Sequence, residues 1–294
     1  MACFTPVTIK NDGESLTVKC NRCVGCIYDN AREWSIRCIH EKMFSDSACF
    51  ITLTYNSDNL PEDGLIHYSD FQSFMKRLRR YFEGRKIRFF ATGEYGERNK
   101  RPHFHAILFG VDFEFKLGRD GKVVRDRKGV WRNKKYCLYQ SETLHRLWGK
   151  GFCSIGNCSS KSVAYVAKYQ LYKLDESNSV QHIMRCSKGI GARWCDKYLD
   201  EVLKRGYIVS DNQKYSVPRY YLKRFENVCY KTATHENIHK IEQQTVDKYK
   251  EKKIKFFLEK QKKELDIFRT TGILESQHEH ECMLLLNKFY SRSL

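Results

Sequence analysis

Residues 101–110 have the sequence Arg-Pro-His-Phe-His-Ala-Ile-Leu-Phe-Gly. Side chains alternate between the two faces of a β-strand, so His103 and His105 are expected to share one face with Ile107 and Phe109. The intervening positions are apolar as well. Both faces of this strand are therefore predicted to be buried, as in the middle of a sheet.

Two neighbouring histidines on a covered strand need partners for their ring nitrogens, because unpaired polar groups are unfavourable in the interior. A metal ion or a phosphate could supply them, and a pair of hydrogen-bonded structural histidines is the alternative. A hairpin with the expected strand over 87–94 would bring Glu94 or Glu97 beside His103 and His105. Two imidazoles and a carboxylate form a three-ligand site with open positions, which admits Mn²⁺ or Mg²⁺ but also Zn²⁺ or Fe²⁺.

The composition indicates a folded, strongly basic protein. The 294 residues are 41% hydrophobic and 14% aromatic, and 53 Lys and Arg against 35 Asp and Glu give a net charge of +18. Such an excess favours a polyanionic partner, nucleic acid before an anionic membrane. No stretch has the roughly 18 uninterrupted apolar residues of a membrane span, and the first residues lack the features of a signal peptide, so a cytosolic protein is expected.

Thirteen cysteines are many for such a chain, and here they favour buried thiols or metal ligands over disulfides. Two-residue spacings between Cys20, Cys23 and Cys26 could clamp one soft metal, as structural zinc or in an iron–sulfur cluster. The candidate structural zinc set is Cys20, Cys23, Cys26 and Cys38, with Cys3 and His40 as alternatives for the last position. Reduced thiols without any metal are the competing interpretation.

Basic and aromatic residues recur in two further segments. A helix that Ser69 could cap has an apolar face and a basic outer face, and residues 219–224 interleave aromatic and charged side chains that could stack on unpaired bases. Ordinary solvated surfaces are the alternative for both segments. The candidate nucleic-acid-binding residues are Arg101, Lys76, Arg77, Arg79, Arg80, Arg219 and Tyr220.

A helix following Ser159 or Ser160 carries tyrosines away from its packing face. At about 100° per residue, an aliphatic stripe that includes Val163 and Val166 lies opposite Tyr165, Tyr169 and Tyr172. Lys168 follows Tyr165 by one turn and lies near the same edge. Tyrosines beside a lysine and away from the core suit contact with phosphates.

A strand ending Thr52-Leu53-Thr54-Tyr55, a His-x-His strand and a Tyr-x-x-Lys-Tyr helix follow one another in the chain. Phosphoryl transfer from DNA to tyrosine needs all three, because a phenol with a pKa near 10 is a weak nucleophile and a metal held by imidazoles can polarise the phosphate. The products would be a 5′-phosphotyrosine and a free 3′-hydroxyl that can prime a polymerase.

These segments together resemble the replication initiators of the HUH endonuclease superfamily, and more closely those of microvirus-type, gokushovirus-like single-stranded DNA phages. The resemblance covers about the first 220 residues and is carried by an ordered set of motifs. They are Met1-Ala2-Cys3, the cysteine knuckle with Arg32-Glu33-Trp34, Phe50–Tyr55, Gly93–Glu97, Arg101–His105, Ala164–Tyr169 and Gly189–Gly191.

The resemblance implies a rolling-circle initiator that nicks and rejoins single-stranded DNA at one site and strand. His103, His105 and Glu94 would hold Mg²⁺ or Mn²⁺, with Glu97 as the alternative carboxylate. Tyr165 and Tyr169 would be paired nucleophiles, and Lys168 would contact the phosphate. The implied partners are the DNA origin and, since no phosphate-binding loop of the Gly-x-x-x-x-Gly-Lys type is present, a host helicase and polymerase. The implied location is the host bacterial cytoplasm.

The implied fold is α+β, with a central antiparallel sheet flanked by helices. We expect a Cys-rich segment over 1–48 packed on the catalytic domain, an endonuclease core over 49–175, an extension of the core over 176–230 and a Lys-rich helical tail over 231–294. A relaxase or transposase of the same superfamily is one competing function. A non-catalytic, zinc-containing DNA-binding protein is the other.

Overall fold

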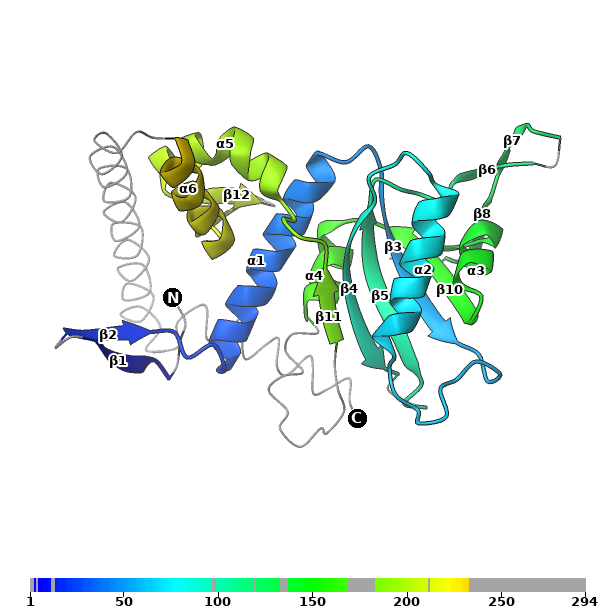
Figure 1. The fold of residues 1–294 in the computed structure, drawn as a ribbon, viewed down its shortest axis with the longest axis horizontal. Coiled ribbons are helices and arrows are strands. Elements are labelled where there is room, and N and C mark those ends of the chain that lie inside the picture. Colours follow the sequence, from blue (N-terminus) through cyan, green and yellow to red (C-terminus); the bar gives the residue numbers. More distant parts are fainter. Residues whose placement is uncertain are drawn as a thin grey trace, which may run out of the picture. The chain divides into compact units, whose positions relative to one another are not determined.

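A seven-stranded, wholly antiparallel sheet organises one of two compact units in the computed structural model (Figure 1). The structure describes residues 3, 5–11, 14–96, 99–118, 120–132, 137–168, 183–210 and 212–232. This unit spans Asn30–Ile190, and the other comprises Met1–Asp29 and Gly191–Leu294. Helix α1 (Val24–Met43) runs from one unit into the other, so the chain divides differently from the four expected segments.

The strand order in the sheet is β11-β4-β5-β3-β10-β9-β8. The strands are β3 (Ala48–Tyr55), β4 (Arg88–Tyr95), β5 (Pro102–Phe109), β8 (Arg127–Arg132), β9 (Cys137–Ser141), β10 (Gly151–Asn157) and β11 (Ile183–Cys186). The histidine strand is β5, and it lies between β4 and β3. The prediction of a central strand buried on both faces is confirmed.

The two faces of this sheet pack against different helices. Helices α2 (Tyr68–Tyr81) and α3 (Glu142–Trp148) cover the face that carries Phe104 and Leu108. The face that carries Ile107 packs against the part of α1 beyond Asn30 and against α4 (Ser160–Lys168). The expected α+β fold with a flanked antiparallel sheet is confirmed.

Two helix starts test the expected caps. Helix α2 begins at Tyr68 with His67 at its N-cap and no side-chain capping bond, so the cap expected at Ser69 is wrong because Ser69 lies inside the first turn. For α4, the Ser159 hydroxyl accepts a hydrogen bond from the Ser162 amide at 3.2 Å, as expected of a capping serine.

The 111–140 segment contains more strand than its charged sequence suggests. It forms a separate hairpin of β6 (Phe115–Leu117) and β7 (Val123–Arg125), followed by β8 and β9 of the main sheet. Figure 1 shows the β6–β7 hairpin projecting from the sheet.

The other unit is built from hairpins and helices. Strands β1 (Val7–Asn11) and β2 (Glu14–Val18) pair with each other near the N-terminus. After Gly191 come helix α5 (Ala192–Arg205), the hairpin of β12 (Ile208–Ser210) and β13 (Gln213–Tyr215), and helix α6 (Arg219–Thr232). Trp194 of α5 stacks on the buried Tyr221 of α6 at a centroid distance of 5.6 Å. Beyond its first two residues, the tail expected over 231–294 lies outside the described residues.

Candidate active site

The antiparallel registers of β5 with its two neighbours bring five polar residues to one face of the sheet. His103 lies opposite Glu94 of β4 and Thr54 of β3, and His105 lies opposite Thr52 of β3 on the other side of the strand from β4. Directly paired residues point to the same face of a sheet. The hairpin thus brings Glu94 to the histidines, whereas Glu97 lies outside the described residues.

The ring nitrogens of both histidines converge on one carboxylate. The Nε2 atoms of His103 and His105 lie 2.8 and 2.6 Å from Glu94 Oε1. One ligand atom from each of these residues lies within 4.8 Å of those of the other two. We call Glu94, His103 and His105 the histidine set.

The opposite ring nitrogens are held by the surrounding strands. His103 Nδ1 donates a hydrogen bond to the Arg101 carbonyl at 3.1 Å, and His105 Nδ1 is 2.9 Å from Thr52 Oγ1. Metal-binding histidines are oriented in this way, with one nitrogen fixed by a hydrogen bond and the other turned toward the ion. The donor atoms therefore fit a cation bound through both Nε2 atoms and the carboxylate.

Burial and hydrogen bonding set the charges of the histidine set. Burial alone would raise the pKa of Glu94, but hydrogen bonds with both histidines outweigh it and lower this pKa. Burial alone would lower the pKa of His103, but the hydrogen bond with Glu94 raises it, whereas for His105 burial dominates and the pKa is lowered. An ionised carboxylate and a neutral imidazole are the forms that bind a metal ion.

Tyr165 of α4 lies directly beside the histidine set. Its hydroxyl oxygen is 3.5 Å from His105 Nε2, and 42% of the residue surface is exposed. Phe50 stacks on the His105 ring and meets the Tyr165 ring edge-on, at centroid distances of 5.5 and 6.1 Å. On the opposite side of α4, Val163 and Val166 are fully buried, so the predicted division of this helix into a packing stripe and an exposed tyrosine is confirmed for its described part.

The remaining expected members of the site are not described in the same detail. Lys168 is the last residue of α4, and the position of its side chain is not among the described features. Tyr169 and Tyr172 lie outside the described residues. Their expected roles stay predictions.

The expected DNA-binding residues are distributed over both units. Lys76, Arg77, Arg79 and Arg80 all belong to α2, which packs on the sheet face opposite the histidines. Arg77 donates hydrogen bonds to the carbonyls of Leu147 and Trp148, at 2.8 and 3.0 Å, and therefore ties α2 to α3.

Arg101 donates to the Tyr55 carbonyl at 2.9 Å, where it fixes the end of β3 close to the histidine strand. Arg219 and Tyr220 begin α6 in the other unit. Arg101 is thus the described member of the expected DNA-binding residues that lies nearest along the chain to His103.

The structure brings only part of the expected zinc set together. Cys20, Cys23 and Cys26 are joined by Cys3, with one sulfur from each within 4.8 Å of the others. We call these four residues the cysteine set. Cys38 instead lies fully buried in the core between α1, α4 and the sheet. Because α1 rises about 1.5 Å per residue, Cys38 is about 18 Å along the helix from Cys26, too far to share an ion.

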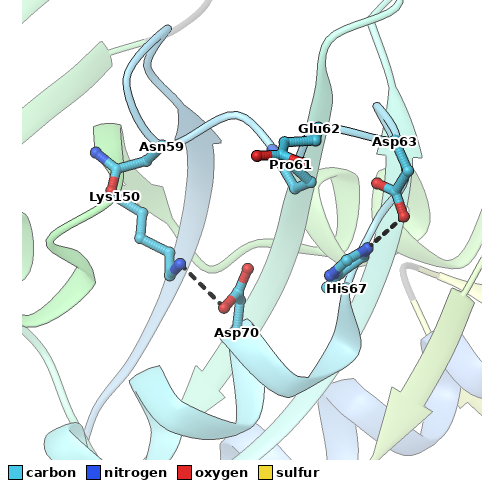
Figure 2. A pocket seen from close by; sticks show the side chains of 7 residues that line it. All are labelled: Asn59, Pro61, Glu62, Asp63, His67, Asp70 and Lys150. Carbon is cyan, nitrogen blue, oxygen red and sulfur yellow. Dashed lines mark hydrogen bonds and ion pairs between the residues drawn. The ribbon is translucent and has the colours of Figure 1, made fainter.

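An open pocket of about 460 Å³ lies beside the start of α2 (Figure 2). It is lined by Asn59, Pro61, Glu62, Asp63, His67, Asp70 and Lys150. Lys150 contacts Asp70 at 3.1 Å and His67 contacts Asp63 at 2.8 Å, so its cationic groups already face carboxylates. This acidic lining is unsuited to a phosphate, and none of the histidine set lines it.

Sequence reasoning missed two residues of the site. Thr52 and Phe50 both lie on β3, and the alternation of that strand places them on the histidine face. The signal was present, since a strand paired with β5 must contribute every second side chain to the same face. The pairing of β3 with β5 was the missing information.

These features define an α+β protein with an antiparallel sheet that carries a two-histidine, one-carboxylate cluster beside an exposed tyrosine. Residues 48–174, which include all of these groups, match the family of the phage replication-associated protein ORF2.

Curated relatives extend the match beyond these residues. The chain is 33% identical to replication-associated protein VP4 of Bdellovibrio phage phiMH2K over 74% of this chain and 70% of the relative. It is 32% identical to replication-associated protein ORF2 of Spiroplasma virus 4 over 71% of this chain and 68% of the relative. Replication-associated protein ORF4 of Chlamydia phage 1 is 28% identical over 70% of this chain and 53% of the relative.

The chain therefore belongs to this family of phage replication-associated proteins. No solved structure matches it. Within the described part of the chain, no helix is both long and apolar enough to span a bilayer.

Proposed function

We propose that this protein initiates rolling-circle replication of a single-stranded DNA phage genome, as a metal-dependent nickase and ligase of the HUH type. Its membership in a family of phage replication-associated proteins supports the replication role. The chemistry is supported chiefly by one observation, the Tyr165 hydroxyl 3.5 Å from His105 Nε2 and next to a convergent cluster of cation-binding groups.

In this proposal the histidine set holds Mg²⁺ or Mn²⁺. When bound, the ion polarises the scissile phosphate and offsets the charge that develops on its oxygens. Glu94 supplies the negative charge, and the two imidazoles supply neutral donors. Thr52 and the Arg101 carbonyl fix the rings, so little reorganisation is needed when the DNA arrives.

Tyr165 acts as the nucleophile. Its oxygen loses the phenolic proton and forms a bond to phosphorus, while the bond from phosphorus to the 3′ oxygen breaks and that oxygen takes up a proton. The products are a 5′-phosphotyrosine and a free 3′-hydroxyl, which primes synthesis. The reverse reaction, with a 3′-hydroxyl attacking the phosphotyrosine, rejoins the strand.

A second tyrosine allows the cycle to repeat. Tyr169 follows Tyr165 by four residues, a spacing that would keep both on one face if α4 continued. One tyrosine then stays linked to the 5′ end while the other cleaves the regenerated origin. Lys168 contacts the phosphate in this scheme.

The charge and the remaining partners follow from the same role. A net charge of +18 favours binding to the phosphate backbone of the origin. The sequence has no nucleotide-binding loop, so a host helicase would unwind the DNA and a host polymerase would extend the 3′-hydroxyl. The protein would act in the host bacterial cytoplasm.

The decisive experiment incubates the full-length protein with single-stranded DNA from the origin of its own replicon and Mn²⁺. Denaturing electrophoresis then detects a covalent adduct. Tyr165→Phe, Tyr169→Phe and the double variant are compared with Tyr81→Phe, a control for an exposed tyrosine on α2. We expect a metal-dependent adduct that the control retains and the double variant lacks.

The two single variants report the division of labour between the tyrosines. Loss of the first cleavage only in Tyr165→Phe would assign initiation to the tyrosine beside the histidine set. Tight DNA binding without an adduct under any metal would contradict the nickase and favour a non-catalytic DNA-binding protein.

A further inference from the structure

The cysteine set belongs entirely to the unit that does not contain the histidine set. Cys20, Cys23 and Cys26 come from the turn that leads into α1, and Cys3 comes from the segment before β1. The β1–β2 register explains this meeting. It pairs Val7 with Val18, and continuing the same ladder for two residues brings Thr5 opposite Cys20.

Contacts around Cys20 agree with this alignment. The Thr5 hydroxyl donates to Cys20 Sγ at 3.3 Å, and the Cys20 amide donates to Cys3 Sγ at 3.3 Å. The hairpin therefore fixes a fourth sulfur beside three that are close in sequence.

The backbone between Cys20 and Cys23 folds as a tight knuckle. Asn21 has φ of 58°, in the left-handed region, and the amides of Arg22 and Cys23 donate to Cys20 Sγ at 3.4 and 3.3 Å. Amide donors directed at a sulfur stabilise its thiolate form, which is the form that binds metals.

Cys26 completes the cluster from the first turn of α1. Its sulfur is 3.9 Å from that of Cys20, too far for the 2.05 Å bond of a disulfide. The free amides at a helix N-terminus give that end a partial positive charge, which favours thiolates there.

The charge states of the two sulfurs agree with this geometry. Hydrogen bonds from Thr5 and from the Arg22 and Cys23 amides lower the pKa of Cys20 to about 5. Burial, followed by contacts with the neighbouring cysteines, raises the pKa of Cys26 to about 12.

From this geometry we infer that Cys3, Cys20, Cys23 and Cys26 bind one zinc ion. Four sulfurs at the corners of a tetrahedron, each about 2.3 Å from Zn²⁺, lie about 3.8 Å apart. The 3.9 Å between Cys20 and Cys26, and the 4.8 Å limit on all pairs, match this spacing closely. A complete set of four protein ligands leaves no position for substrate, which is the arrangement of a structural zinc site.

Zinc at this position would fasten the N-terminal hairpin to the start of α1. The ion would connect Cys3 to a turn 17 residues later in the chain. Metal binding to preorganised cysteines contributes directly to folding stability, so removal of zinc should loosen the hairpin.

The test measures metal in the purified full-length protein by mass spectrometry and by cobalt substitution. The histidine set could also take up zinc, so the wild type is compared with the double variant His103→Ala, His105→Ala. We expect one zinc per chain in that double variant. Its cobalt form should show the intense thiolate charge-transfer bands and visible bands of a tetrahedral site.

Cys3→Ala and Cys38→Ala form a matched pair of cysteine variants. Cys3→Ala should weaken zinc binding by at least about 100-fold, whereas Cys38→Ala should bind as the wild type does. Cys23→His keeps four ligands and should retain zinc with a shifted cobalt spectrum, which separates loss of a ligand from loss of folding.

Several results would overturn the inference. They are the absence of zinc together with a cobalt form that lacks thiolate bands, bound iron in place of zinc, and loss of zinc in Cys38→Ala but not in Cys3→Ala. DNA nicking does not enter these readouts, so they are independent of the proposed function.

Discussion

The histidine set takes its members from two long strands, whereas the cysteine set takes three of its four sulfurs from the seven residues between Cys20 and Cys26. In the first, the register between β4 and β5 decides which carboxylate meets the histidines. In the second, a local turn decides most of the geometry, and one residue arrives through a hairpin.

The two sets also differ in what they leave open. Three nitrogen and oxygen ligands leave coordination positions for a phosphate, and an exposed tyrosine lies next to them. Four sulfurs form a closed site. A chain that contains both kinds of site can reserve one metal for chemistry and the other for folding, provided that each site selects its own ion.

Replacement of His105 should separate the two sites most strongly. His105→Ala removes a ligand and the ring next to Tyr165, so nicking should fall at least about 1,000-fold, equivalent to about 4 kcal/mol. Zinc in the cysteine set should be unchanged. Adduct formation and metal content are measured on the same preparation, with His145→Ala, an exposed histidine of α3, as the control.

A result in which His105→Ala loses its zinc as well as its activity would contradict the independence of the two sites. Loss of activity in His145→Ala would show that general damage to the protein, and not ligand loss, had been measured.

A smaller effect is expected from the threonines on either side of His105. Thr52 contacts His105 Nδ1 at 2.9 Å, whereas the hydroxyl of Thr92 is buried and has no hydrogen-bond partner among the described residues. Thr52→Val should weaken Mn²⁺ binding by about 10- to 100-fold, because it frees the imidazole to rotate. Thr92→Val should leave binding unchanged and be neutral or slightly stabilising.

Titration calorimetry with Mn²⁺ tests this pair, with zinc content as a reference for the cysteine set. Equal effects of the two valines would show that strand packing, and not the Thr52 hydrogen bond, orients His105.

Much of the histidine set could be predicted from the sequence, because alternation along a strand and the geometry of a hairpin are local rules. They placed His103 and His105 on one face and brought either Glu94 or Glu97 to them. The choice of Glu94 required the register, which pairs it with His103. The orienting role of Thr52 required the pairing of β3 with β5, which are separated by more than 40 residues.

The cysteine set shows the opposite limit. Spacing identified Cys20, Cys23 and Cys26, but the fourth position depended on a hairpin that the sequence reasoning did not anticipate. Cys38 was attractive because it follows on the same predicted segment. A continuous helix instead carries it about 18 Å from Cys26 and into the core.

The smallest effect is expected at Asp126, which belongs to neither set and therefore shows what a loss of stability alone does to both. Its carboxylate accepts hydrogen bonds from the Ser141 hydroxyl at 2.5 Å and from the Thr143 amide at 3.3 Å, at the start of α3. Burial alone would raise the pKa of Asp126, but these hydrogen bonds outweigh it and lower the pKa below its ordinary value.

A carboxylate whose pKa is lower in the folded than in the unfolded protein stabilises the fold above the unfolded pKa, about 3.9, and loses this contribution as the pH falls through the folded value. Asp126→Asn should therefore reduce the free energy of unfolding by roughly 1–2 kcal/mol at pH 7 and by less below pH 4. Denaturant unfolding at both pH values measures this, with Asp58→Asn in an exposed turn as the control. If zinc content and Mn²⁺ affinity at pH 7 stay at wild-type values while stability falls, the losses in His105→Ala and Thr52→Val are ligand effects. A destabilisation that grows toward low pH would contradict the assignment of the lowered pKa to Asp126.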